Sequence, residues 1–269
     1  MANPKGGVGK TSIVANVAGI AAKSGWRVLA VDLDPQGDLS ADLGYGAQNY
    51  DADGNQFTEA VLWGGDVTPM ASVRPNLDVL SGGSRLDELV DGTEHGLANT
   101  LRAAAVGYDL VLIDCPPGVG TLLDGALLAS RWIVVPVRLD PGSLDGLQVL
   151  ARRVGGIRNE HNPDIGLLGV ALFGVVSGVE SVVDEVTELL ETDLQGVAPV
   201  LAPPIRHDER SAFEMRRLGM LAHESPVTGL ATDYLRLSAE ILSMVSAPLS
   251  MVSAPLSMVS APMAEGLSA

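Results

Sequence analysis

A glycine-rich segment near the N-terminus limits the fold more than any other feature of this sequence. Residues 5–11 read KGGVGKT and contain two of the three lysines in the chain, Lys5 and Lys10, whereas 14 of the 17 basic residues are Arg. Such a turn lets backbone N–H groups surround phosphates, while the Lys before Thr11 reaches the β- and γ-phosphates and the Thr hydroxyl binds Mg²⁺. The segment therefore predicts a nucleotide-binding phosphate loop between a strand and a helix.

The loop departs from the standard pattern, G-x-x-x-x-G-K-[ST]. Pro4 stands where that pattern has its first glycine, and an additional lysine, Lys5, precedes two glycines. The segment resembles the deviant Walker A loop, xKGGxGK[ST], of the family that includes ParA, MinD, the nitrogenase iron protein and the anion-pump ATPases. The resemblance implies a homodimer with two ATP molecules between its subunits, in which Lys5 reaches the partner's nucleotide. The residues implied to bind ATP in the loop are Lys5, Gly6, Gly7, Val8, Gly9, Lys10, Thr11 and Ser12.

An acidic motif follows a hydrophobic run of strand length at residues 26–31. The run leads into DLDPQGD at residues 32–38, which places carboxylates at the C-terminal end of a strand, where an α/β sheet binds its ligands. The string VDLDPQGDLS is similar to the second ATP motif of the ParA branch, in which Asn is common at the position of Asp38. The similarity implies that Asp34 orients the attacking water and contributes to the metal site. We expect Asp32 to hold the site together.

A third motif, YDLVLIDCPPG at residues 108–118, is a hydrophobic strand that ends in Asp114. A carboxylate there acts on Mg²⁺ directly or through water. The string resembles the ParA pattern, whose Pro-Pro-Gly would sense the γ-phosphate. We expect Asp109 to be a turn residue. The single cysteine, Cys115, excludes disulfides and the cluster-binding branches of the family, which need two cysteines per subunit or a Cys-x-x-Cys pair.

Hydrophobic runs of strand length alternate with helical stretches along a chain that is 46% apolar. This order is typical of a parallel sheet flanked by helices. We therefore predict an α/β fold, a mostly parallel sheet flanked by helices, of the P-loop NTPase type. Strands are expected near residues 27–32, 77–80, 109–114, 132–137, 166–172 and 199–202. Helices are expected at residues 10–24, 94–106, 119–129, 142–160, 181–191, 208–219 and 228–243.

The strand that should precede the phosphate loop is represented only by Met1, Ala2 and Asn3. Because that strand lies in the middle of the sheet in phosphate-loop proteins, we expect its beginning to be missing, so that a central position is vacant. In-frame codons upstream should then encode about five Val/Ile/Ala-rich residues, a typical strand length, and a stop codon directly before Met1 would refute this. The alternative is that a shortened first strand suffices.

The C-terminal end is a repeat. Residues 243–249 read SMVSAPL, residues 250–256 repeat them, and residues 257–263 read SMVSAPM. A proline in each unit argues against a coiled coil, and six serines without flanking Lys or Arg argue against a membrane span. The tail also has no basic residue with which to bind anionic lipid. We predict an ATPase domain over residues 1–242, a flexible tail over residues 243–269, and no membrane association.

The formal net charge of −16 opposes nucleic-acid binding, because phosphate contacts need basic groups, although a local basic patch can still provide them. The ParA resemblance implies non-specific DNA binding through arginines on one face of the dimer. The candidates are Arg206, Arg210, Arg216 and Arg217, which acidic residues interleave. The same resemblance makes Pro204 and Ile205 candidate neighbours of adenine.

Together these motifs resemble those of a ParA-type partition ATPase. The resemblance implies ATP and Mg²⁺ as cofactors, catalysis by Lys5, Lys10 and Asp34, and a metal site of Thr11, Asp34 and Asp114. It further implies ATP-driven dimerisation, DNA binding and stimulation by a ParB-like partner, in segregation of a plasmid or chromosome. With no secretory signal, a cytoplasmic, nucleoid-associated protein is expected. The alternatives are a relative that positions a protein cargo, and a truncated remnant that neither binds nor hydrolyses ATP.

Overall fold

The computed structural model describes residues 1–193, 199–225 and 228–246. Its strands are β1 Val28–Asp32, β2 Met70–Arg74, β3 Leu77–Leu80, β4 Leu110–Asp114, β5 Trp132–Val137, β6 Gly166–Val175 and β7 Val200–Arg206. Its α-helices are α1 Lys10–Lys23, α2 Leu39–Asp42, α3 Asn55–Trp63, α4 Glu94–Ala104, α5 Thr121–Ala129, α6 Pro141–Glu160, α7 Glu180–Asp193, α8 Glu209–Leu218 and α9 Thr228–Ser246. Short 3₁₀ turns lie at η1 Gly46–Gln48, η2 Ser84–Glu88 and η3 Ala222–Glu224.

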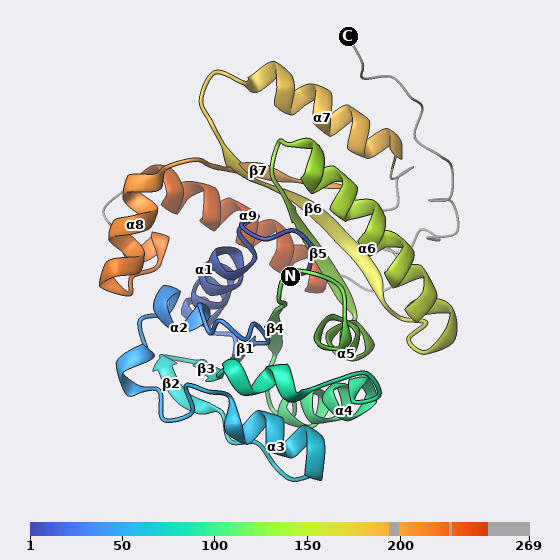
Figure 1. The fold of residues 1–269 in the computed structure, drawn as a ribbon. Coiled ribbons are helices and arrows are strands. Elements are labelled where there is room, and N and C mark those ends of the chain that lie inside the picture. The colour runs from blue at the N-terminus through green and yellow to red at the C-terminus, as the bar shows by residue number, and fades with distance from the viewer. Residues whose placement is uncertain (194–198, 226–227, 247–269) are drawn as a thin grey trace.

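The strands form two sheets, in the orders β2-β3-β1-β4 and β5-β6-β7. Every pair is parallel except β2 with β3. Helices cover the strands on both sides, with α1 and α9 opposite α4, α5 and α6 (Figure 1). The predicted α/β fold with a mostly parallel sheet between helices is confirmed.

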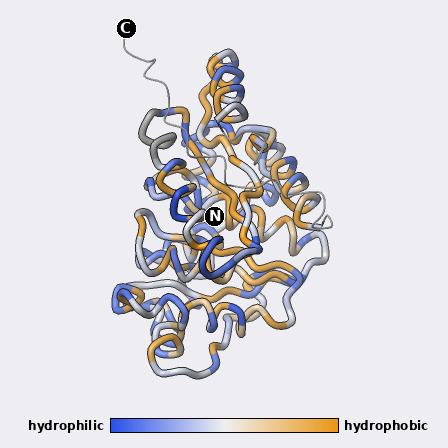
Figure 2. Tube along the Cα trace, turned by 90° about the vertical axis from the view of Figure 1, so that its right-hand side faces the viewer, coloured by the Kyte–Doolittle hydropathy of each residue, from blue (hydrophilic) through white to orange (hydrophobic). Residues whose placement is uncertain are grey.

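The residues of β1 explain why a sheet of this kind needs a continuous hydrophobic run. Leu29 and Val31 belong to the core on the side of α4, α5 and α6, whereas Val28 and Ala30 belong to the core on the side of α1 and α9. All four side chains are fully buried. A parallel strand covered on both faces cannot alternate apolar with polar residues. Hydrophobic residues accordingly follow the strands through the middle of the molecule (Figure 2).

The first two residues lie between the two sheets. The Met1 ammonium donates to the Ile113 carbonyl at 2.6 Å, and the Cys115 N–H donates to the Met1 carbonyl at 3.3 Å. On the other side, the Ala2 N–H donates to the Val134 carbonyl at 3.1 Å. The chain therefore passes between β4 and β5 immediately before the phosphate loop, as Figure 1 shows. This is the central position expected for the end of the strand that precedes the loop.

Helix α9 continues to Ser246, four residues beyond the boundary predicted at Leu242. The repeat after Ser246 lies outside the described residues, and the prediction of a separate tail is untested. Among the helices of the described part of the chain, none combines the length and hydrophobicity that crossing a bilayer requires.

Candidate nucleotide-binding site

The backbone of the phosphate loop turns through conformations that favour glycine. Gly7 has φ of 71° and Gly9, the N-cap of α1, has φ of 89°. A Cβ on Gly9 would also lie 2.4 Å from the ring of Phe173, so no side chain fits there. The turn delivers the chain into a 14-residue helix that begins at Lys10. The free N–H groups and the positive dipole end of such a helix attract phosphate.

Lys10 is held inside the loop. Its Nζ donates to the Asn3 carbonyl at 3.1 Å and to the Lys5 carbonyl at 3.0 Å, and the residue is buried. Burial lowers the pKa of Lys10, while the nearby carboxyl of Asp114 opposes that shift. The ammonium is thus positioned by two weak carbonyl acceptors, which a phosphate could replace.

Asp114 ends β4 below the same loop. The residue is fully buried, and among the described residues neither carboxylate oxygen accepts a well-formed hydrogen bond, although the Thr11 hydroxyl lies near enough to affect its pKa. Burial raises its pKa to about 6, against opposing effects of the Thr11 hydroxyl, the Met1 ammonium and Lys10. A buried carboxylate without partners is costly unless something compensates it. Thr11 and Asp114 therefore fit a bound cation.

Asp32 and Asp34 have different surroundings. Asp32 is buried and accepts hydrogen bonds from the backbone N–H groups of Asp34 at 3.0 Å and Leu39 at 3.2 Å; burial raises its pKa. The Asp34 carboxylate is half-buried, and among the described residues its one hydrogen-bond donor is the nearby Gln36 N–H, at 3.0 Å. Asp32 thus holds the loop that carries Asp34, as expected.

Asp109 pairs with Arg27 away from the loop, and that hydrogen-bonded guanidinium lowers the pKa of Asp109 to about 2.

Asn3 is a site residue that sequence reasoning did not identify. Its buried amide donates to the Pro136 carbonyl at 2.8 Å, and its Oδ1 accepts the Lys5 N–H at 2.8 Å. Asn3 therefore ties the start of the phosphate loop to the end of β5. A Cβ on Gly146 of α6 would lie 2.7 Å from that Oδ1. The only available signal was an Asn two residues before Lys5.

Lys5 forms an ion pair with Asp140, in the loop between β5 and α6, and both side chains are about one-third exposed. In the single subunit, the additional lysine is therefore paired with a carboxylate of the same chain.

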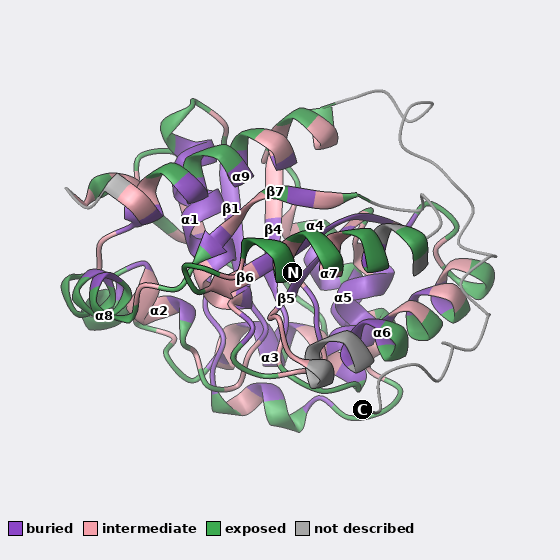
Figure 3. Cartoon of the chain, turned by 90° about the horizontal axis from the view of Figure 1, so that it is seen from above, coloured by how far each residue is buried: buried purple, intermediate pink, exposed green. Residues whose placement is uncertain are grey.

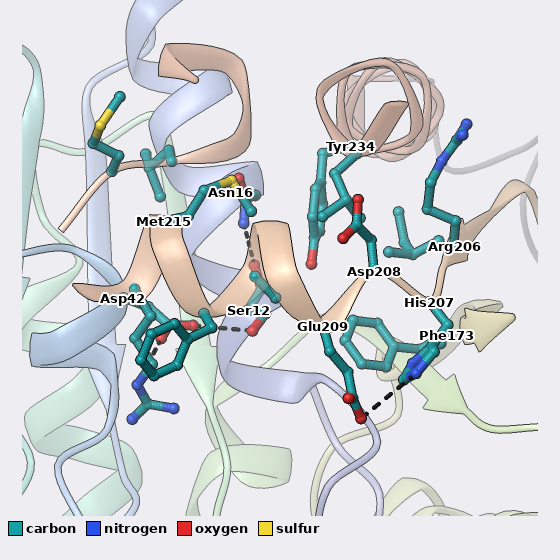
Figure 4. A pocket seen from close by; sticks show the side chains of 18 of the residues that line it. Ser12, Asn16, Asp42, Phe173, Arg206, His207, Asp208, Glu209, Met215 and Tyr234 are labelled. Carbon is teal, nitrogen blue, oxygen red and sulfur yellow. Dashed lines mark hydrogen bonds and ion pairs between the residues drawn. The ribbon is translucent and has the colours of Figure 1, made fainter. Parts of the chain in front are cut away.

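A cavity of about 320 Å³ opens beside the N-terminal end of α1. Ser12 lines it and donates to Asp42 at 3.0 Å, with Phe173 and the fully buried Tyr234 nearby (Figure 4). Of the two candidate adenine neighbours, Ile205 lines this cavity, whereas Pro204 is not among its lining residues. The structure therefore brings Ser12 and Ile205 together from opposite ends of the chain.

The four candidate DNA-binding arginines differ in their surroundings. Arg206 lines the cavity and pairs with Asp233 of α9 (Figure 4). Arg216 pairs with Asp38 and lies 3.5 Å from an oxygen of Asp42. Arg210 and Arg217 are exposed on α8, which presents most of its surface to solvent (Figure 3); Arg210 lies 3.4 Å from Glu214. Arg206 and Arg216 are thus already engaged by acidic residues of the same chain.

Arg138, at the end of β5, was not predicted as a site residue. It lines the cavity beside Phe173, and its guanidinium lies 3.4 Å from the place of a Cβ on Gly174. Among the side chains that the structure describes, no carboxylate forms an ion pair with Arg138, unlike Arg206 and Arg216. It offers the cavity a cation that no described carboxylate of its own subunit neutralises.

We expect stability without nucleotide to depend on pH through Asp114. Because folding raises its pKa from 3.8 to about 6, the stabilising contribution is full below the unfolded pKa and is lost as pH rises through 6. Two pKa units correspond to roughly 3 kcal/mol. The Asp114→Asn variant should therefore show a flatter decline in the free energy of unfolding between about pH 4 and about pH 7, measured by urea denaturation.

Asp109→Asn is the matched control for this measurement. The pKa of Asp109 is lowered, so its stabilising contribution is present above the unfolded pKa and is lost only as pH falls through about 2. This variant should keep the slope of the unaltered chain over the same window. Equal slopes for the unaltered chain and Asp114→Asn would show that Asp114 is not the titrating group.

The AAA domain family model matches residues 1–167. The chain is 31% identical over 249 residues to the chromosome-partitioning ATPase Soj of Thermus thermophilus, covering 91% of this chain and 95% of that protein. It is 37% identical over 179 residues to the sporulation initiation inhibitor protein Soj of Bacillus subtilis, covering 63% and 69%. An uncharacterized Mycobacterium tuberculosis protein is 36% identical over 181 residues, or 64% of this chain, which spans 56% of that protein.

Solved structures agree with these sequence matches. Cobyrinic acid a,c-diamide synthase from Mycobacterium smegmatis, with bound ATP analog and magnesium, has a TM-score of 0.71 and 28% identity over 91% of this chain and 93% of that one. The Pyrococcus furiosus cell division ATPase MinD shares the fold, with a TM-score of 0.70 and 22% identity over 90% of this chain and 96% of that one. With a family model over more than half of its length and a relative aligned over nearly all of it, the chain belongs to the family of ParA-type partition ATPases.

Proposed function

We propose that this chain is an ATPase that binds MgATP at the phosphate loop and hydrolyses it to ADP and phosphate to drive partition of a plasmid or chromosome. One observation carries the proposal: the buried Asp114 has two unpartnered oxygens directly below the loop, beside Lys10 and Thr11. A magnesium ion and a triphosphate would supply the charges that this arrangement lacks.

Each residue has a distinct role in this proposal. The N–H groups at residues 6–12 and the Lys10 ammonium hold the phosphates, and Thr11 and Asp114 hold Mg²⁺, which withdraws charge from the phosphate oxygens when bound. Asp34 orients the attacking water and contributes to the metal site, in keeping with its electrostatic effects on both Lys10 and Asp114. Phosphoryl transfer needs little covalent help from a protein, so positioning and charge stabilisation provide most of the catalysis.

We propose that two subunits meet over this site, with Lys5 of each reaching the nucleotide of the other. A second cavity of about 710 Å³ is lined by residues 34–36 and residues 116–123, and so includes Asp34, the residue proposed to orient the water. Val90 and Val119 line it and are 61% and 56% exposed. A partner subunit would cover these exposed apolar side chains.

A dimer requires Lys5 to leave Asp140, and this gives a prediction. The Asp140→Asn variant removes the charge that holds the ammonium within its own subunit, so dimerisation with a non-hydrolysable ATP analogue and Mg²⁺ should strengthen severalfold, in keeping with roughly 1 kcal/mol for a partly exposed ion pair. Sedimentation equilibrium measures this. The control, Asp164→Asn, changes an exposed carboxylate after α6 and should leave the dimer unchanged. Weaker dimerisation of Asp140→Asn would contradict the role given to Lys5.

Non-specific DNA binding and stimulation by a ParB-like partner complete the proposed cycle. Of the four candidate arginines, Arg210 and Arg217 best support a DNA contact, because both are exposed on one helix, seven residues apart. The electrophoretic mobility of non-specific DNA should fall when the protein is added with ATP, and should stay unchanged when it is added with ADP. Equal mobility with both nucleotides would remove DNA from the cycle and favour positioning of a protein cargo.

Thermal unfolding with and without saturating MgATP tests the core of the proposal. A ligand that binds only the folded state raises stability by mass action, about 2.7 kcal/mol at one hundred times its Kd. We expect a rise in melting temperature of several degrees, together with release of phosphate. β4 and β5 belong to two separate sheets. This break favours, as a second candidate, a remnant that neither binds nor hydrolyses ATP. A melting temperature that MgATP does not change would support that candidate.

A further inference from the structure

Among the described residues, Arg138 is the one arginine that lines the cavity of about 320 Å³ beside α1 without a carboxylate partner. Two other arginines line this cavity, and both are engaged: Arg206 pairs with Asp233, and Arg216 pairs with Asp38. The Arg138 side chain is half-buried. A charged group that is withdrawn from water without a counter-charge is costly. The cavity therefore suits a ligand that brings an anionic group to this guanidinium.

The carboxylates that line the same cavity do not supply that counter-charge. Asp42 accepts the Ser12 hydroxyl at 3.0 Å. Asp208 caps α8, where it accepts the Ser211 N–H at 3.0 Å, and Glu209 is exposed to solvent. Each of these acidic groups has another partner or lies in water, so the counter-charge must come from the ligand.

The guanidinium of Arg138 lies over Gly174, near the end of β6. Its Cζ, Nη1 and Nη2 atoms are 3.4, 3.5 and 3.7 Å from the place of a Cβ on Gly174, whose φ of 70° also favours glycine. The preceding residue, Phe173, lies in the cavity lining (Figure 4) and packs its ring against Gly9 of the phosphate loop. β6 therefore places the guanidinium at the end of the cavity that adjoins the loop.

The backbone around Arg138 is fixed as well. Before it, the Pro136 carbonyl accepts the side-chain amide of Asn3 at 2.8 Å. After it, the Asp140 N–H donates to the Arg138 carbonyl at 2.8 Å, and the Asp140 carboxylate pairs with Lys5. Contacts with the N-terminal segment thus hold the chain on both sides of Arg138. Such support positions a binding group before its ligand arrives.

We propose that Arg138 binds the α-phosphate of the nucleotide. This inference rests on the proposed function and adds to it a residue outside both the phosphate loop and the metal site. The loop and Lys10 hold the β- and γ-phosphates, whereas the α-phosphate joins them to the nucleoside in the cavity, and Arg138 lies where the two meet. A guanidinium offers a phosphate two parallel, charge-assisted hydrogen bonds. Arg138 is therefore a binding residue, and it serves ATP and ADP equally.

Competition by AMP and by adenosine against a fluorescent ADP analogue tests the proposal on the full-length chain, because these two ligands differ only in the α-phosphate. In the unaltered chain, AMP should compete at least about tenfold better than adenosine, as one charge-assisted contact predicts. Arg138→Ala should abolish this advantage and should weaken ATP and ADP by the same factor. Arg138→Lys keeps the charge without the planar fork and should retain part of the advantage.

Arg131→Ala is the matched control, because Arg131 directly precedes β5 as Arg138 directly follows it. Arg131 is exposed and lies 5.1 Å from the centre of the Trp132 ring, so its removal should leave the advantage of AMP unchanged. Without nucleotide, Arg138→Ala should melt within about 2 °C of the unaltered chain, since it loses no ion pair with a described residue. If it does not fold, Arg138→Gln replaces it in the same assay.

An advantage of AMP that survives in Arg138→Ala would overturn the inference. Equal weakening of AMP and adenosine would place Arg138 on the base or the ribose, and a loss limited to ATP would place it on the γ-phosphate; each result would also overturn it. All three results leave the proposed function intact. An unaltered chain that binds none of these nucleotides would overturn both.

Discussion

The Lys10→Ala variant should show no rise in melting temperature at MgATP concentrations that stabilise the unaltered chain, and no measurable hydrolysis. Lys10 Nζ is buried within hydrogen-bond distance of two loop carbonyls, so a phosphate that enters the loop meets this ammonium directly. Charge-assisted hydrogen bonds of a buried ammonium contribute about 1.5–3 kcal/mol each. Affinity for ATP should therefore fall at least about one hundredfold, measured by calorimetric titration.

Lys23→Ala is the matched control, since it removes the exposed lysine at the other end of α1. It should bind ATP like the unaltered chain. The Lys10 variant also loses two hydrogen bonds to its own loop, so its circular dichroism spectrum must show that it is folded. A folded Lys10→Ala chain with unchanged affinity would mean that the nucleotide lies elsewhere, and the proposed function would fail with it.

The sequence was most informative where a strand is covered on both faces. The runs at β1, β4 and β5 are hydrophobic over their whole length, and their expected positions agree with the structure to within one residue. β2 was not predicted, because it is an edge strand with no fully buried residue and an irregular pairing with β3. Its Ser72 has φ of 57°. α3 has nine residues between Gly54 and Gly64, too short for a clear helical period.

In the site, too, the residues of a local motif were predicted, whereas residues placed by contacts between distant parts of the chain were not. Lys10 and Thr11 lie in one short loop, and the loop chemistry identified them directly. The contacts of Asn3 with Pro136, and of Lys5 with Asp140, join residues more than 130 positions apart. No local pattern encodes them, because they depend on β5 ending beside the loop. Arg138 follows the same rule, since its place in the cavity depends on the packing of β5 against β6.

The Asp34→Ala variant should bind MgATP and release no phosphate. The Asp34 carboxylate is half-buried, follows β1, and accepts one N–H within its own turn from the described part of the chain, so its remaining lone pairs can accept from a water. Its backbone N–H is fixed by the buried Asp32, which keeps the loop in place after the side chain is removed. Loss of a water-positioning group should lower the turnover number by roughly 10²–10⁴, with ATP affinity within a few-fold of that of the unaltered chain.

Asp38→Ala is the control for this variant, because Asp38 lies on the same turn but is exposed and paired with Arg216 of α8. It should hydrolyse ATP at nearly the unaltered rate. Measuring phosphate release and ATP affinity on the same preparations separates chemistry from binding. If Asp34→Ala lost affinity and turnover equally, Asp34 would act on the bound metal rather than on water. If turnover survived, Asp114 would be the carboxylate left within reach of the phosphates, and the roles of the two residues would have to be exchanged.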